Sequence, residues 1–244
     1  MQTVLAIDIG NTNIAAGLFR GRRMIKRIKV STGACFAYGR AFKPLAGSAD
    51  KVIISSVVPL ALSRVLVCLK RLGLRDIEVT GKDVIVPIRN LYRKAGEVGQ
   101  DRLVNAYAAR KFYGAPCVVV DFGTAITFDV VSGKGEYLGG LILPGISMGL
   151  KSLYEKTALL PRVELKPARH IIGKDTVSSM RGGILFGYGA LVNGLSVKYR
   201  AILGPKTRII ATGGNSRLIR RYAASIDVVD EDLTLKGLLF LTDL

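Results

Sequence analysis

The sequence predicts an α/β protein with two similar halves, each a mixed sheet flanked by helices, that face each other across a cleft. The first observation behind this prediction is an internal repeat, because the segment DIGNT at residues 8–12 returns as DFGTA at residues 121–125. Each copy ends an apolar run and precedes a second strand and a hairpin. Strand and helix signals then alternate through both halves. We therefore expect one domain over residues 1–115 and a second over residues 116–244.

Composition places the chain among folded globular proteins. It has 244 residues with 49% hydrophobic content, which is enough to bury a core. Its three cysteines are widely spaced and form no CxxC pair, so we expect reduced thiols and a cytoplasmic location. The most apolar stretch, residues 52–69, is interrupted by polar side chains and predicts no membrane span.

The charge balance is strongly basic, with a net charge of +18. The densest basic run, residues 20–29, alternates with apolar residues and predicts the solvated face of an edge strand. No helix-turn-helix, zinc-finger or RNP-type motif accompanies this charge, so we expect at most non-specific binding of nucleic acid. Since His170 is the single histidine, catalytic triads with histidine and histidine-rich zinc sites are disfavoured.

Apolar runs bounded by turn signals predict the strands of the first half, and helical spacing predicts its helices. A glycine at residue 73 is the stop signal of the second helix. The expected strands are residues 3–9, 14–19, 22–30, 51–55, 77–80 and 84–88. The expected helices are residues 34–45, 60–72 and 101–113.

The same signals recur in the second half. Two prolines predict an irregular segment over residues 158–172. The expected strands are residues 117–122, 126–131, 136–143, 208–211 and 226–229. The expected helices are residues 148–157, 175–203, 216–224 and 233–241.

The two repeated turns have the residue types of a phosphate site. Gly10 lets the backbone approach an anion, and the amides of the turn can donate to phosphate oxygens. Asp8 is a candidate ligand for Mg²⁺, and Asp121 and Thr124 are candidates for a cation and a phosphate oxygen. An ordinary hairpin turn explains one copy equally well. The second copy after another buried strand favours phosphate binding.

Two further segments add to this pattern. Gly213 and Gly214 follow a strand and open a helix, where an adenine can lie against the backbone and a phosphate against the helix N-terminus. Asp101 begins a helix, and a favourable helix dipole worth about 0.3–1 kcal/mol is explanation enough for an acid there. Beside two phosphate turns, Asp101 becomes a candidate base for a substrate hydroxyl, with Arg102 pairing an anionic group.

The ordered set of motifs resembles the type III pantothenate kinases, a family related to the Bvg accessory factor. The motifs are DIGNTN, GQDR, VVVDFGTAITFD, GGLILPGISM, GKDTVSSMRGGILFGY and ATGGN, and they extend over nearly the whole chain. The resemblance implies two tandem ribonuclease H-like, or actin-like ATPase, domains around a nucleotide cleft. It also implies a homodimer that phosphorylates pantothenate to 4′-phosphopantothenate with ATP, the first step toward coenzyme A. The implied ions are Mg²⁺ and a monovalent cation, K⁺ or NH₄⁺.

The resemblance also implies roles for individual residues. Asp101 matches the proton acceptor, Asp121 the ligand of the monovalent cation, and Gly123 and Thr124 the ATP contacts of the second turn. The residues that match the ATP phosphate segment are Asp8, Ile9, Gly10, Asn11, Thr12, Asn13, Ile14 and Ala15, and those that match the adenosine site are Gly213 and Gly214. The residues that match substrate contacts are Tyr92, Gly99, Gln100, Asp101, Arg102 and Thr176. Gln100 departs from the small or aliphatic residue that is usual there.

Three alternatives remain open at this point. A sugar or acid kinase would share the fold and differ in substrate. A regulator of the Bvg accessory factor type would account for the basic charge, although the presence of both Asp8 and Asp101 argues for catalysis. An actin-like filament protein or chaperone needs subdomains for which the chain has no room.

Overall fold

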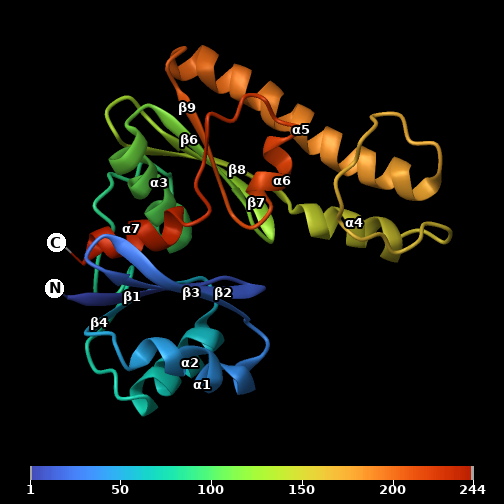
Figure 1. Cartoon of the computed structure of the whole chain (residues 1–244). Coiled ribbons are helices and arrows are strands. Elements are labelled where there is room, and N and C mark those ends of the chain that lie inside the picture. The colour runs from blue at the N-terminus through green and yellow to red at the C-terminus, as the bar shows by residue number, and fades with distance from the viewer. Residues whose placement is uncertain (1, 243–244) are drawn as a thin grey trace. The chain divides into compact units, whose positions relative to one another are not determined.

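The structure, a computed structural model, describes residues 2–242 of the chain (Figure 1). The chain forms two compact units. The first consists of Met1–Ile88, Tyr92–Ala108 and Leu233–Leu244, and the second consists of Arg89–Leu91 and Ala109–Asp232. Each unit contains one mixed five-stranded sheet with helices packed on it, so the predicted α/β class with two similar sheets is confirmed.

The sheet of the first unit has the order β3-β2-β1-β4-β5. Its strands are β1 (Thr3–Ile9), β2 (Asn13–Arg20), β3 (Arg23–Ser31), β4 (Lys51–Ser56) and β5 (Ile77–Val79). Its helical elements are η1 (Cys35–Ala37), α1 (Tyr38–Ala46), α2 (Pro59–Arg71), η2 (Ala95–Glu97), the first part of α3 (Gln100–Tyr113), and α7 (Leu233–Leu241). β1, β2 and β3 form antiparallel pairs, whereas β1, β4 and β5 are parallel.

Side chains of β1 alternate between the two faces of this sheet. Leu5, Ile7 and Ile9 are fully buried in the core that α1 and α2 cover. The intervening residues face α7, because Ala6 pairs with Gly17 and a Cβ at Gly17 would lie 3.3 Å from Leu235 Cδ1 of α7. Asp8, two residues after Ala6, is therefore on the face that carries α7.

The second unit repeats this arrangement with the strand order β10-β9-β6-β7-β8. Its strands are β6 (Cys117–Phe122), β7 (Ala125–Val131), β8 (Tyr137–Pro144), β9 (Arg208–Thr212) and β10 (Val228–Val229). Its helices are the end of α3, α4 (Ile146–Glu155), α5 (Thr176–Leu203) and α6 (Ser216–Arg220). Val118, Val120 and Phe122 of β6 lie in the core with residues of α4, α5 and α6, so Asp121 is on the other face, as Asp8 is in the first unit.

Two expectations from the sequence are wrong. Residues 84–88 form no strand, and only a single bridge joins Val84 to Thr80. The cause is a tight turn in which the Asp83 carboxylate accepts the Val79 N–H at 3.0 Å. The backbone N–H groups of residues 82–84 donate to the Val79 carbonyl. Helix α6 also ends at Arg220, earlier than predicted.

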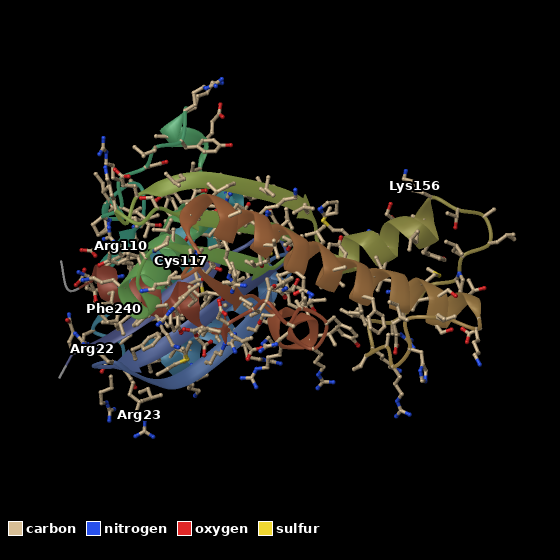
Figure 2. The ribbon with its side chains drawn as sticks, turned by 90° about the horizontal axis from the view of Figure 1, so that it is seen from above. Arg22, Arg23, Arg110, Cys117, Lys156 and Phe240 are labelled. Carbon is tan, nitrogen blue, oxygen red and sulfur yellow. The ribbon has the colours of Figure 1, made fainter. Side chains whose placement is uncertain are left out.

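The basic run falls on an edge strand, as predicted, because β3 is the outermost strand of its sheet. Lys26, Arg27 and Lys29 of this strand are exposed. Just before it, Arg22 lies over the ring of Phe240 at 5.0 Å from its centre (Figure 2). Among residues 2–242, no helix is both long enough and apolar enough to cross a bilayer.

The glycines of α5 provide a paired test of this packing. Gly189 is buried against α6 and its following turn, and an added Cβ would lie 2.6 Å from Tyr222 Cβ. Gly187 is exposed, with open space where its Cβ would be. We expect Gly189→Ala to lower the free energy of unfolding by about 1–3 kcal/mol through overpacking. Gly187→Ala should raise it by about 0.5–1 kcal/mol, because alanine loses less backbone entropy in a helix.

Urea unfolding followed by circular dichroism measures both changes. Opposite signs for the two substitutions are the expected result. Equal effects at the two positions would show that α5 does not pack closely at Gly189.

Candidate active site

In the first unit, polar groups gather at the carboxyl ends of the parallel strands β1, β4 and β5. In sheets of this kind, ligands bind outside these ends. Asp8 is the penultimate residue of β1 and pairs in register with Ser55 of β4. The Val57 N–H, just after β4, donates to the Ile9 carbonyl at 3.2 Å and holds the two strand ends together.

The turn after β1 is held in shape by its own backbone and by the end of β3. The Gly10 N–H donates to the Asn13 carbonyl at 3.0 Å. The Thr32 hydroxyl donates to the Gly10 carbonyl at 2.7 Å, and the Thr32 N–H donates to the Thr12 carbonyl at 3.0 Å. Asn11 and Thr12 are exposed at the tip of the turn.

Two residues of the predicted phosphate segment have buried side chains. Ile9 and Ile14 are fully buried in the core beneath α1 and α2. These two residues offer a ligand only their backbone. Asn13 and Ala15 are partly exposed, at the start of β2.

The start of α3 packs against the same carboxyl ends of the strands in the first sheet. A Cβ at Gly99 would lie 3.4 Å from Val57 Cγ1 and 2.5 Å from Asp101 Oδ1. Gln100 packs against Gly81, just after β5, where an added Cβ would lie 2.6 Å from Gln100 Cδ. Two glycines without side chains therefore let the Gly99–Asp101 segment approach the ends of β4 and β5. Sequence reasoning did not identify Val57 or Gly81, because neither has a local signal of function.

Asp101 is an acid in a partly buried position. Its Oδ1 accepts the N–H of Arg102 at 2.9 Å, which fixes the direction of the carboxylate. Burial raises the pKa of the Asp101 carboxyl, and the Arg102 amide and guanidinium act in the opposite direction without cancelling the rise. A carboxylate with a raised pKa is a stronger proton acceptor than an exposed one.

In the second unit, Asp121 occupies the place that Asp8 has in the first. It lies near the carboxyl end of β6 and pairs with Thr212, the last residue of the parallel strand β9. Gly213 follows with φ of +84° and approaches so closely that an added Cβ would overlap Asp121 Oδ1 and lie 2.8 Å from the Phe122 nitrogen. Only glycine fits this position, because both its backbone angle and its space exclude a side chain.

The remaining predicted residues of this unit surround the same strand ends. The Asn215 N–H donates to the Phe122 carbonyl at 3.4 Å, and the Ser216 hydroxyl donates to the Gly213 carbonyl at 2.7 Å. These bonds hold the Gly213–Gly214 turn against the end of β6. The structure thus brings Asp121, Gly123, Gly213 and Gly214 together.

Gly145 is a member of this second cluster that sequence reasoning did not assign. A Cβ there would overlap the Thr124 carbonyl oxygen and lie 2.9 Å from the Gly123 oxygen. Gly145 is also the N-cap of α4, so the start of this helix lies directly on the second turn. Its signals in the sequence are a Pro-Gly pair before a helix and its place in the motif GGLILPGISM.

Tyr92 and Thr176 lie apart from these clusters in sequence and in element. Tyr92 is in the loop before η2, with 37% of its surface exposed. Thr176 is the exposed first residue of α5. The cap of this helix is Asp175, which accepts the Ser178 N–H at 2.7 Å, so Thr176 is not needed for capping.

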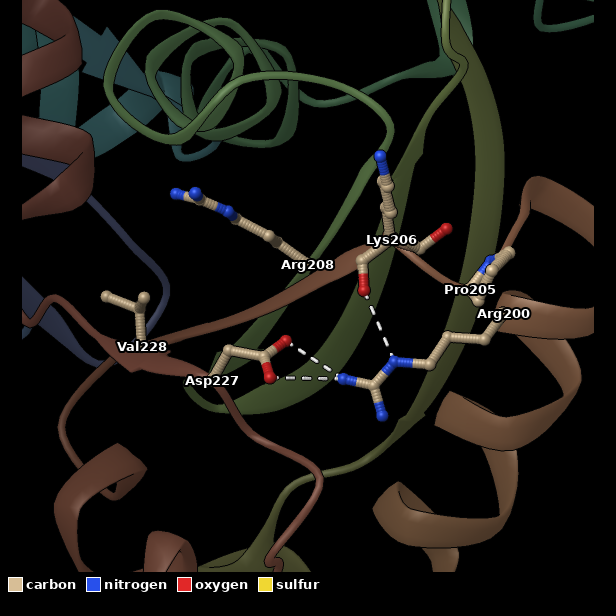
Figure 3. A pocket seen from close by; sticks show the side chains of 7 residues that line it. Arg200, Pro205, Lys206, Arg208, Asp227 and Val228 are labelled. Carbon is tan, nitrogen blue, oxygen red and sulfur yellow. Dashed lines mark hydrogen bonds and ion pairs between the residues drawn. The ribbon is translucent and has the colours of Figure 1, made fainter.

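The second unit also has a pocket of about 430 Å³ that contains none of the predicted residues (Figure 3). It lies where β9 and β10 begin, at the opposite end of the sheet from Asp121. Arg200 donates to both Asp227 oxygens at 3.1 and 2.9 Å, and Asp227 accepts the Ile209 N–H at 2.7 Å. These bonds anchor α5 to the sheet of the second unit.

The chain is similar to known proteins over most of its length. The family model for type III pantothenate kinase matches residues 4–198. The chain is 41% identical to the Type III pantothenate kinase of Myxococcus xanthus over 251 residues, which covers 96% of each chain. It is 40% identical to that of Syntrophobacter fumaroxidans over 248 residues, which covers 96% of this chain and 95% of the relative.

Solved structures support the fold. One from Campylobacter jejuni, described as of the Baf family of transcriptional activators, has a TM-score of 0.59 at 17% identity and covers 98% and 96% of the two chains. The inorganic polyphosphate/ATP-glucomannokinase from Arthrobacter sp. has a TM-score of 0.52 at 15% identity and covers 99% of both. At such identities the likeness concerns the fold alone, which is that of actin-like ATPases and related kinases.

The raised pKa of Asp101 predicts that Asp101→Asn stabilises the protein at neutral pH. The native state keeps this proton to a higher pH than the unfolded chain, whose pKa is about 3.9. The stability that the Asp101 carboxyl contributes is therefore fully present when the pH is below the pKa of the unfolded state. It is lost as the pH rises through the pKa of the native state. Asparagine carries no charge at any pH, so its advantage should appear at pH 7 and vanish near pH 3.

Thermal unfolding at both pH values measures this difference. Asp76→Asn, at an exposed site, is the control for the loss of one negative charge. A change in unfolding temperature at pH 7 no larger than that of the control would contradict the prediction.

Proposed function

The chain belongs to the type III pantothenate kinase family, and we propose that it transfers the γ-phosphoryl group of ATP to the hydroxyl of pantothenate, the first step toward coenzyme A. The observation that carries the proposal is the place of Asp101. The start of α3 holds this acid at the carboxyl ends of the parallel strands, where Asp8 and the Gly10–Asn13 turn also lie. Phosphoryl transfer needs a base and a phosphate-binding turn close together, and both lie at this end of the sheet.

In the proposed reaction, Asp101 accepts the proton of the attacking hydroxyl. A new bond forms between that oxygen and the γ-phosphorus, the bond from this phosphorus to the β–γ bridging oxygen breaks, and ADP leaves. The Arg102 N–H bond to Asp101 Oδ1 keeps the carboxylate in one orientation. The raised pKa of Asp101 increases its strength as a base.

The turns of the two units are proposed to bind ATP. In the first unit, the backbone amides of Gly10–Asn13 and the exposed side chains of Asn11 and Thr12 would donate to phosphate oxygens. In the second unit, Thr124 would contact ATP, and the Gly213–Gly214 turn would accept adenosine against its backbone. Fixed amide dipoles that need no rearrangement stabilise the charge that develops during transfer.

The donor set of the first unit suits Mg²⁺ held together with nucleotide phosphates. Mg²⁺ commonly takes one or two protein carboxylates, with phosphate oxygens and water completing its shell. Asp8 supplies one carboxylate, and residues 2–242 contain no group of three or more His, Cys, Asp or Glu side chains suited to a metal. When bound, Mg²⁺ neutralises charge on the phosphates.

We extend the proposal to three properties that the family resemblance implies. Tyr92 and Thr176, with the Gly99–Arg102 segment, would contact pantothenate. The protein would act as a homodimer. It would work in the cytoplasm, and the free state of Cys35, Cys68 and Cys117 suits a reducing compartment.

The decisive test is the release of ADP with ATP and Mg²⁺, with and without pantothenate. We expect release to require pantothenate. Asp101→Asn should reduce turnover by about 10²- to 10⁴-fold, because it removes the base. Nucleotide affinity should persist in this variant, because the turns of both units remain.

A panel of sugars and other hydroxyl acids is the control for substrate identity. Release of ADP with another acceptor and none with pantothenate would overturn the substrate. Full turnover by Asp101→Asn would overturn the base. Binding of ATP without turnover of any acceptor would favour the regulatory alternative.

Asp121 generates a separate prediction about the monovalent cation. Hard cations take oxygen ligands, and the Asp121 carboxylate is packed against the backbone of Gly123 and Gly213. We expect Asp121→Asn to lower the response of turnover to K⁺ or NH₄⁺ several-fold. Turnover is measured while K⁺ replaces choline at constant ionic strength. A variant that responds to K⁺ as the wild type does would show that the cation binds elsewhere.

A further inference from the structure

One row of residues crosses the first sheet next to the phosphate-binding turn. In register across β3, β2, β1 and β4, the row consists of Lys29, Ala15, Asp8 and Ser55. Paired residues on neighbouring strands point to the same face of a sheet. The Lys29 side chain is therefore on the face of Asp8, although the two residues are 21 positions apart in sequence.

The residue between them leaves the path open. Neighbouring strands lie about 4.8 Å apart, so the backbones at Lys29 and Asp8 are separated by about 10 Å. Ala15 extends only a methyl group into this space and is itself partly exposed. The four-carbon stem of a lysine can lie across one alanine and bring its ammonium group over the end of β1.

The turn itself contains no positively charged side chain. Residues 8–19 contain Asp8 and no lysine or arginine, so the turn meets phosphate with amides and hydroxyls alone. On this face, Lys29 is the basic residue of β3 nearest the turn, since Arg27 is two residues farther along the strand and pairs with Gly17. The Lys29 ammonium group has no hydrogen bond or ion pair with another residue in the described part of the chain.

Ser55 of β4 lies at the other end of the row. Ser55 is completely buried, and its hydroxyl has no hydrogen-bond partner among the described residues. A buried hydroxyl without a partner costs about 1–3 kcal/mol, so such groups usually meet water or a ligand. The row thus combines an ammonium group without a partner in the described chain, a carboxylate and a buried hydroxyl. It crosses the sheet near the carboxyl end of β1, where the turn begins.

We propose that Lys29 binds the terminal phosphates of ATP and supplies the positive charge that the turn lacks. This inference deepens the proposed function and rests on its assignment of ATP phosphates to the Gly10–Asn13 turn. An ammonium group so placed would neutralise the phosphates in the ground state and during transfer. Lysine is suited to this task as a compact point charge with rotatable donors.

The same strand offers a matched control. Lys26 is also exposed and carries the same charge, but it pairs with Leu18, which is in the core beneath α1 and α2. Lys26 therefore points to the opposite face. A substitution there changes the net charge equally without touching the row of Asp8.

The experiment measures binding of ATP and of adenosine by calorimetry, without pantothenate, for the wild type, Lys29→Gln, Lys29→Arg and Lys26→Gln. We expect Lys29→Gln to weaken ATP binding by about 10- to 100-fold, as for other charged hydrogen bonds. Adenosine binding should be unchanged, Lys29→Arg should retain most of the affinity for ATP, and Lys26→Gln should stay within about twofold of the wild type. In turnover, Lys29→Gln should raise KM for ATP.

Equal small losses for Lys29→Gln and Lys26→Gln would overturn the inference, because Lys29 would then be only one charge in a general field. Equal losses for ATP and adenosine would also overturn it. If the wild type binds ATP but releases no ADP with pantothenate, the proposed function fails, while the comparison of ATP with adenosine still decides the role of Lys29. If the wild type turns over pantothenate and Lys29→Gln behaves as Lys26→Gln does, the inference fails alone.

Discussion

The alternation of side chains along β1 and β6 is the constraint on which both sites depend. Every second residue of these strands is buried under helices, and this burial is the main stabilising contribution of each sheet. The same alternation turns Asp8 and Asp121 to the other face. A shift of one residue in register would bury an acid in an apolar core, at a cost of several kcal/mol. The packing that holds each unit together therefore also sets the direction of its acid.

The features that the sequence predicts well are local. A buried strand, a glycine turn and a returning strand lie next to one another in the chain, so apolar runs and turn residues were sufficient to predict the hairpins at Asp8 and Asp121. Residues 84–88 show the limit of such reasoning. Their apolar composition indicates a strand, but the Asp83 side chain captures the Val79 amide and turns the chain before pairing can continue.

The features that it does not predict are close approaches between distant segments. Gly81 is an ordinary loop glycine in the sequence, whereas Gly99 and Gly145 belong to motifs of the family. Only the folded chain shows that a side chain at each of the three would strike a neighbour. The return of α7 to the first sheet is similar, since its apolar sequence marks it as buried but gives no indication of where. Asp101 was found through a motif, whereas the contact with Val57 that places it is visible only in three dimensions.

The basic charge of the chain acts at two levels that obey different physics. With 36 Lys and Arg against 18 Asp and Glu, the chain attracts anions generally, and both ATP and pantothenate are anions. This general field raises encounter rates, falls with ionic strength and does not depend on which lysine supplies it. The effect of a charge that binds a ligand directly depends instead on its place in the register. Lys29 and Lys26 lie on one strand, but their register places them on opposite faces of the sheet. Net charge alone therefore says little about where a ligand binds. The face of the strand on which a charged side chain lies can identify the binding site.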